Sequence, residues 1–179
     1  NFLYEAVEAH RSELIALSDQ IWEYAELSMQ EYRSAEAYIN LLQKHGFSVK
    51  TKLAGIPTAF SGSYGSGKPV IGFLGEFDAL SGLSQKSGVS HKEALASGGC
   101  GHGCGHNLLG AGALGAAIAI KEAIKAGQLS GTVIFYGCPG EEGGSGKAFM
   151  ARDGAFDGLD KIIESRTDRS AIGFDAPVE

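Results

Sequence analysis

Two apolar segments follow each other in the middle of the chain, and together they limit the folds that it can adopt. Residues 107–126 consist mostly of Ala, Leu, Ile and Gly, which predicts a buried helix that ends at Gly127. Residues 131–138 then predict a buried strand, because residues 132–136 within them are continuously β-branched or aromatic, the pattern of a strand covered on both faces. A buried strand beside a buried helix predicts helices packed on a central sheet.

The residues before this pair supply further helices and strands. Apolar side chains at helical spacing predict one long amphipathic helix over residues 2–26 and a second from Glu31 to Gly46. Three short β-rich runs follow, separated by Gly, Pro and Ser turns, at residues 47–53, 58–64 and 70–77. We therefore predict an α/β fold, a layered α/β/α domain with a mixed, mostly parallel sheet. Such sheets carry their sites at the carboxyl ends of the strands.

The length and charge of the chain restrict its partners. A chain of 179 residues suits one domain, which we assign to residues 1–160, and residues 161–179 stay unassigned because they show no clear periodicity. The formal net charge of −6 comes with no basic stripe, so we expect no nucleic-acid partner. The longest apolar run, residues 108–120, is shorter than the ~20 residues that span a bilayer, so we expect no membrane partner. A small-molecule partner is favoured.

The cysteines and the amino end bear on the cellular compartment. All three cysteines lie between positions 100 and 138, and an odd number in so short a stretch does not form a disulfide framework. The amino end lacks the basic, apolar and small-residue pattern of a signal peptide. We therefore predict a reducing, cytoplasmic location.

Soft metal ligands alternate with glycine just before the predicted buried helix, at Cys100, His102, Cys104 and His106. Thiolate and imidazole together favour zinc or a similar transition metal. Two other interpretations stay open. The histidines could merely cap the helix, or all four side chains could close one structural zinc site, although structural sites usually take ligand pairs from two separated segments.

Paired carboxylates, Glu141 and Glu142, follow the predicted strand at residues 131–138. Two adjacent carboxylates are costly to charge together unless they share a cation or a proton, and hydrolytic sites use such pairs as one ligand and one base. The alternative is two solvated acids on a turn. A third candidate is Asp78, which lies with Glu76 on one face at the end of the strand 70–77 and could hold a metal-bound imidazole in its tautomer.

Two glycine patterns resemble nucleotide-binding motifs without their context. Residues 62–68 nearly match a phosphate-binding loop, but Pro69 replaces the required Ser or Thr and the segment joins two strands, which predicts a hairpin turn. Residues 110–115 match the dinucleotide pattern but lie inside the predicted helix, so we interpret these glycines as packing residues.

The three chemical motifs, in this order and spacing, resemble the aminoacylase and carboxypeptidase G family of metallo-amidohydrolases, peptidase family M20. The resemblance extends over about residues 10–160 and is carried by residues 75–80, 102–110 and 131–144. It implies a zinc-exopeptidase-like fold, two divalent ions (zinc or manganese), hydrolysis of the amide bond of an N-acyl amino acid or dipeptide-like substrate, and a homodimer. Asn107 and Leu109 stand where the hippurate-hydrolase branch has Asp and His, which favours a substrate of the aminobenzoyl-glutamate type.

The same resemblance assigns roles to individual residues. Cys104 is expected to bridge two metal ions, His106 to complete one site and Glu142 to bind the other ion. Glu141 is expected to be the general base, and Asp78 matches the acid that orients a ligand.

This sequence departs from the family pattern in one respect. The family takes two further histidine ligands from segments beyond the Glu-Glu turn, whereas this chain has no histidine after His106. Family members also carry a smaller lid and dimerisation domain, which we expect to be absent from this chain. Two alternatives to a catalytic domain therefore stay open, a zinc-stabilised binding module without catalysis and a truncated, inactive homologue.

Overall fold

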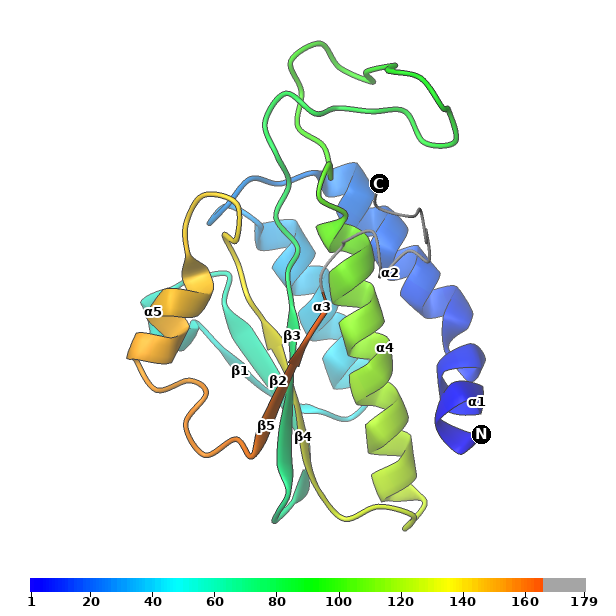
Figure 1. Ribbon diagram of the computed structural model, residues 1–179, viewed down its shortest axis with the longest axis vertical. Helices are drawn as coiled ribbons and strands as arrows, with labels where there is room; N and C mark the ends of the chain where they lie inside the picture. The colour runs from blue at the N-terminus through cyan, green and yellow to red at the C-terminus, as the bar shows by residue number, and fades with distance from the viewer. Residues whose placement is uncertain (166–179) are drawn as a thin grey trace, which may run out of the picture.

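A computed structural model describes residues 1–165 of the chain, and Figure 1 shows its arrangement. The elements in chain order are α1 (Phe2–Ala9), α2 (Arg11–Tyr24), α3 (Tyr32–Lys44), β1 (Ser48–Thr51), the 3-10 helix η1 (Leu53–Gly55), β2 (Phe60–Ser66), β3 (Val70–Gly75), α4 (His106–Lys125), β4 (Gly131–Gly137), α5 (Gly146–Arg152) and β5 (Lys161–Glu164). The predicted second helix, the three early strands, the buried helix and the strand after it are confirmed within a few residues at each end.

The five strands form one mixed sheet in the order β1-β2-β4-β3-β5. β3 runs parallel to β4 and to β5, whereas β1 with β2 and β2 with β4 are antiparallel. The predicted mixed sheet is therefore confirmed, with parallel pairing in two of its four strand pairs. β4 lies at the centre, as its continuous apolar run requires.

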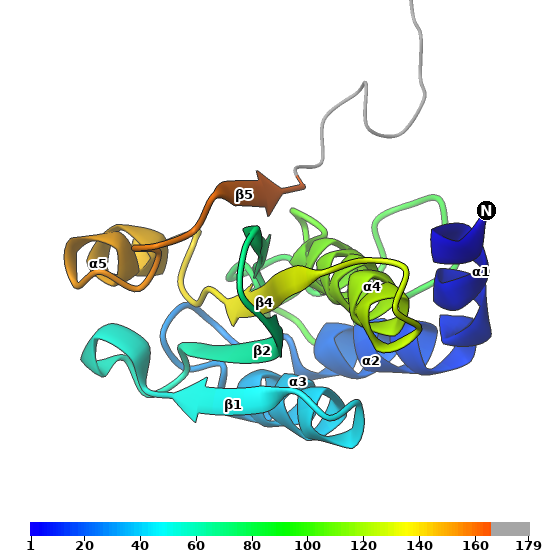
Figure 2. The same ribbon diagram turned by 90° about the horizontal axis from the view of Figure 1, so that it is seen from below.

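Helices cover both faces of this sheet, which confirms the predicted α/β/α layering (Figure 2). Val133 and Phe135 of β4 pack into the larger core with α2, α3 and α4. Ile134 and Tyr136 point to the opposite face and pack in a smaller core with α5 and η1. The alternation of these four side chains explains why residues 133–136 are apolar or aromatic without a break.

α4 is the central helix of the larger core. Its length and apolar composition would suffice to cross a membrane, and more than half of its most apolar stretch is buried against the sheet, α1 and α2. Packing in the core therefore accounts for its composition.

The single long helix predicted over residues 2–26 is wrong, because the chain forms two helices there. The backbone N–H of His10 donates to Val7, and the next helix begins at Arg11. This break changes the direction of the chain, so that α1 packs on α4 while α2 packs against both α3 and α4 (Figure 2). Apolar spacing alone does not reveal such a change of direction.

The hairpin predicted at residues 62–68 is also wrong. β2 and β3 do not pair with each other because β4 is inserted between them. Thr132 of β4 fixes the connection, since its backbone N–H donates to Pro69 O over 2.9 Å and its hydroxyl donates to Gly67 O over 2.8 Å. A long-range strand replaces the local pairing that the turn residues suggested.

The segment that the sequence leaves unassigned begins with a strand. β5 pairs with β3 over residues 161–164 and forms one edge of the sheet. The remainder of the predicted tail, residues 166–179, lies outside the described residues.

Candidate metal centre

The predicted site residues lie where β3, β4 and α4 meet. Asp78 follows the end of β3, Glu141 and Glu142 follow the end of β4, and His106 is the first residue of α4. These ends face the long connection over residues 81–105, which contains no helix or strand (Figure 1). The predicted side chains therefore gather at the carboxyl ends of the parallel strands β3 and β4, where the candidate site was expected.

His106 is the centre of the cluster and is almost completely buried. Its Nδ1 lies 3.0 Å from an oxygen of Asp78, and its Nε2 lies 3.0 Å from an oxygen of Glu76. The same Nε2 is 3.7 Å from Glu141 and 4.0 Å from Glu142. One ring nitrogen is therefore held by Asp78 while the other is directed at three carboxylates.

Asp78 uses both of its carboxylate oxygens to fix its neighbours. Oδ1 contacts His106, and Oδ2 accepts hydrogen bonds from the Ser28 hydroxyl over 2.7 Å and from the backbone N–H of Glu142 over 2.9 Å. Burial alone would raise the pKa of Asp78, but these hydrogen bonds lower it below its usual value. The side chain therefore stays ionised and ties α4 to the turn after β4.

Two groups of three ligand atoms form around His106. Cys104, His106 and Glu142 make one group, Glu76, His106 and Glu141 make the other, and within each group the atoms lie within 4.8 Å of one another. Oε1 of Glu142 is buried and accepts no hydrogen bond within residues 1–165. A sulfur, an imidazole and carboxylates beside an unsatisfied buried oxygen fit a borderline-soft divalent ion such as zinc.

The charges of the cluster also favour a cation. Burial would lower the pKa of His106, but its hydrogen bonds to Asp78 and Glu76 raise it to about 11. Lys147 forms ion pairs with Glu76 and with Glu164 of β5. Four carboxylates around one imidazole, with Lys147 beside them, leave an excess of negative charge that a divalent ion would offset.

Cys100 and His102 do not join these ligand groups. His102 is buried, with its Nε2 2.9 Å from the backbone oxygen of Ile21 and its ring stacked near Trp22. Within residues 1–165, no group of potential ligands includes either residue. This arrangement disfavours the four-ligand structural site as an interpretation of the alternating loop.

The sequence analysis assigned no role to two contributors to this site. Glu76 is a potential ligand in its own right, and its position two residues before Asp78 was the available signal. Glu31, at the start of α3, accepts a hydrogen bond from the backbone N–H of Gly140 over 2.8 Å and one from Thr58 over 3.1 Å. It supports the turn that carries Glu141, and no local pattern connects residues so far apart in the chain.

Comparisons with known proteins found relatives in sequence and in fold. A family model described as peptidase family M20/M25/M40 matches residues 72–174. A p-aminobenzoyl-glutamate hydrolase subunit of Escherichia coli (strain K12) is 50% identical over 162 residues, which cover 90% of this chain and 34% of that protein. The N-acetyl-L-cysteine deacetylase of Bacillus subtilis (strain 168) is 31% identical over 157 residues, 84% of this chain and 35% of that protein. The chain thus spans about a third of the length of these curated relatives.

A solved structure shares the fold. The YXEP protein of Bacillus subtilis, described as a dinuclear metal binding peptidase from the M20 family, superposes with a TM-score of 0.76 at 23% identity. The match covers 90% of this chain and 44% of that protein. At this level of identity, the likeness concerns the arrangement of the sheet and helices.

Proposed function

Since this chain belongs to peptidase family M20/M25/M40, we propose that it forms part of a metal-dependent amidohydrolase. The match to more than half of the chain and the 50% identical relative confirm the family resemblance inferred from the three motifs. The observation that carries the proposal is the convergence of ligand atoms from Cys104, His106 and Glu142 next to Glu141.

We propose Cys104, His106 and Glu142 as metal ligands, with Glu76 as a further candidate. An ion at such a site polarises an amide carbonyl and lowers the pKa of a water molecule. The thiolate and imidazole favour zinc over manganese among the two ions considered. The number of two ions is supported by the description of the YXEP protein as dinuclear, and the complete protein would supply the remaining ligands.

Glu141 and Asp78 are the proposed catalytic groups of this chain. Glu141 would accept the proton of the attacking water and return it to the leaving amine, as general acid–base catalysis requires. Its carboxylate lies 3.7 Å from Nε2 of His106, beside the proposed ligand atoms. Asp78 would hold Nδ1 of His106 and leave Nε2 available to an ion.

The substrate proposed for the complete protein is an N-acyl amino acid or dipeptide-like amide of the aminobenzoyl-glutamate type. Its support is the 50% identity to the p-aminobenzoyl-glutamate hydrolase subunit of Escherichia coli. A homodimer and a cytoplasmic location complete the proposal. The family resemblance supports the dimer, and the absence of a disulfide among the three cysteines supports the location.

Two alternatives have different support. A zinc-stabilised binding module would require Cys100 and His102 to join Cys104 and His106, and the buried contact of His102 with Ile21 disfavours it. A truncated, inactive homologue agrees with a chain that spans about a third of its relatives. An activity assay on the protein at the length of those relatives distinguishes the two: hydrolysis favours the enzyme, and no hydrolysis favours the inactive homologue.

The test compares Glu141→Gln with Glu142→Gln in that longer protein. Metal content is measured by elemental analysis. Hydrolysis of p-aminobenzoyl-glutamate is monitored by measuring the glutamate that is released. Glu141→Gln should keep its metal and lose 100-fold or more of its turnover, on the order expected for loss of a general base. Glu142→Gln should lose metal and activity together. Near-normal hydrolysis by Glu141→Gln would exclude it as the base.

A further inference from the structure

A second group of metal-type ligands lies at the opposite end of α2 from the candidate metal centre. It consists of His10, Glu13 and His45, which come from the start of α2 and the end of α3. His102, in the loop that carries Cys104 and His106, contacts α2 at Ile21, roughly 15 Å from the start of the helix at 1.5 Å per helical residue. None of these three residues has a role in the amide hydrolysis proposed above.

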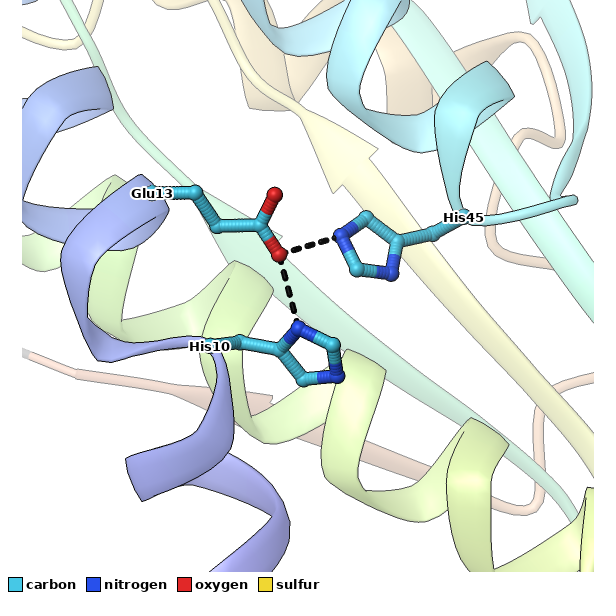
Figure 3. Close-up of side chains that lie close together, drawn as sticks. All are labelled: His10, Glu13 and His45. Carbon is cyan, nitrogen blue, oxygen red and sulfur yellow. Dashed lines mark hydrogen bonds and ion pairs between the residues drawn. The ribbon is translucent and has the colours of Figure 1, made fainter.

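Both imidazoles point at the same carboxylate oxygen (Figure 3). Nδ1 of His10 and Nε2 of His45 each lie 2.7 Å from Oε1 of Glu13. The two rings are nearly perpendicular, with centroids 4.7 Å apart, and the three ligand atoms lie within 4.8 Å of one another. Three donors at this separation need only small shifts to contact one ion at the ~2.0–2.2 Å typical of zinc.

We propose that His10, Glu13 and His45 bind a zinc-type divalent ion on the helical face of the domain. Two imidazoles and one carboxylate form a ligand set that zinc accepts, with a fourth position left for water. The side chains of His10 and Glu13 are 25% and 21% exposed, so solvent reaches the ligand atoms, whereas His45 is 7% exposed and its ring is held by packing. The site is therefore both accessible and partly preformed.

The surroundings match the second layer of contacts found around metal ligands. Oε2 of Glu13 accepts a hydrogen bond from Lys44 over 2.8 Å, which leaves Oε1 for the ion. Nε2 of His10 lies 4.0 Å from a carboxylate oxygen of Glu122 on α4. A carboxylate that hydrogen-bonds the second ring nitrogen fixes the tautomer and strengthens the imidazole as a ligand, and Glu122 would have to approach His10 by about 1 Å to do so.

The balance of charge predicts which ions the site selects. Lys44 pairs with Glu13, and Lys121 pairs with Glu122 over 2.6 Å, so the lysines offset much of the negative charge. The two imidazoles must then supply most of the binding. Imidazole suits zinc, copper and nickel, whereas magnesium and calcium prefer oxygen ligands. An ion here would link the start of α2 to the end of α3 and, through Glu122, to α4.

The experiment titrates Zn²⁺ into the 179-residue chain carrying Cys104→Ser, which removes the thiolate of the candidate metal centre. Calorimetry gives the stoichiometry, and thermal unfolding gives the stabilisation. We expect one zinc ion and a rise in the unfolding temperature, with no rise in Ca²⁺ or Mg²⁺. Glu13→Gln and His10→Asn, each added to this chain, should weaken zinc binding tenfold or more, and Glu122→Gln should weaken it by about tenfold.

A matched control removes an exposed histidine that also pairs with a glutamate. His91 lies 3.1 Å from Glu93 on the connection after β3, and His91→Ala should leave zinc binding unchanged. Circular dichroism checks that each variant is folded. Glu13→Gln is nearly isosteric with the unchanged chain, so a loss of zinc binding in this variant is not explained by unfolding. Zinc binding that persists in folded Glu13→Gln and His10→Asn, or no zinc binding by the Cys104→Ser chain, would overturn the proposal.

Discussion

Asp78 lies 3.0 Å from Nδ1 of His106 on one side and accepts the backbone N–H of Glu142 over 2.9 Å on the other. One buried carboxylate thus joins the end of β3 to a proposed ligand on α4 and to another after β4. These two ligands are 36 positions apart in the sequence, and Asp78 fixes their relative position.

Asp78→Asn should therefore weaken metal binding without unfolding the domain. The amide keeps the shape of the side chain, but its NH₂ group must face either His106 or the two donors, Ser28 and the Glu142 N–H. We expect a 10- to 100-fold loss of zinc affinity, measured by calorimetry on the protein at the length of its relatives. Ser28→Ala, which removes one hydrogen bond to Asp78, should cost much less. Equal affinities of Asp78→Asn and the unchanged protein would remove Asp78 from its proposed role.

Glu31 should make the stability of the domain depend on pH. Burial raises its pKa above the usual value, although the Gly140 N–H partly offsets this effect. An acid with a raised pKa in the folded state contributes stability below its unfolded pKa, and that contribution is lost as the pH rises through its folded pKa. The charged side chain of Glu31 therefore costs stability at neutral pH.

Glu31→Gln removes this titration and keeps an oxygen for the Gly140 N–H. We compare the free energy of unfolding of the variant with that of the unchanged chain. The variant minus the unchanged chain should give a difference that increases as the pH rises from about 4.5 towards neutrality, by at most about 1.4 kcal/mol per pH unit. Urea unfolding at several pH values measures this difference. A difference that stays constant from about pH 4.5 to about pH 8 would contradict the assigned burial effect.

The main elements of the fold were predictable because their side chains carry local signals. The middle of β4, residues 133–136, is apolar or aromatic without a break because both faces of the strand are covered, and α4 is apolar because it is the central helix of the core. The break at His10 and the insertion of β4 between β2 and β3 were not predictable. Both depend on packing between segments distant in the sequence, and the turn residues at 62–68 suit a hairpin as well as they suit the observed connection.

The candidate site was predictable where its residues form short motifs. Cys104, His106 and the Glu-Glu pair come together as the order of the motifs implied. The supporting contact of Glu31 with Gly140 joins residues 109 positions apart, and the group formed by His10, Glu13 and His45 spans two helices. Such contacts follow only from the tertiary packing.

The three cysteines should differ in their reaction with an alkylating reagent. Cys138 is fully buried, and burial raises the pKa of its thiol well above the usual value, so little reactive thiolate forms. Cys100 and Cys104 are both half-buried. Mass spectrometry after brief alkylation should find Cys138 unmodified in the folded chain and modified after unfolding.

Saturating zinc should then slow alkylation of Cys104 but not of Cys100. Only Cys104 lies in a ligand group with His106 and Glu142 within residues 1–165. Cys100→Ser and Cys104→Ser serve as controls that assign each modified peptide. Equal protection of both cysteines would instead support a zinc site formed by the alternating loop.

Gly110 and Gly112 of α4 should respond oppositely to replacement by alanine. A Cβ atom at Gly110 would lie 2.2 Å from the Tyr38 hydroxyl and 2.4 Å from the backbone oxygen of Glu76, so α4 would have to move away from the end of β3. A Cβ atom at Gly112 meets nothing within 4 Å. The interpretation of these glycines as packing residues is therefore confirmed at Gly110 and wrong at Gly112.

We expect Gly110→Ala to destabilise the chain by about 1–3 kcal/mol and Gly112→Ala to stabilise it by about 0.5–1 kcal/mol, both measured by urea unfolding. Tyr38→Phe removes a buried hydroxyl that has no hydrogen-bond partner within residues 1–165. Added to Gly110→Ala, it should restore only part of the stability, because the Glu76 backbone oxygen still obstructs the new methyl group. If the double variant recovers the full stability of the unchanged chain, the clash of the new methyl group is with the Tyr38 hydroxyl alone. Gly110 would then not be needed for the close approach of α4 to the end of β3.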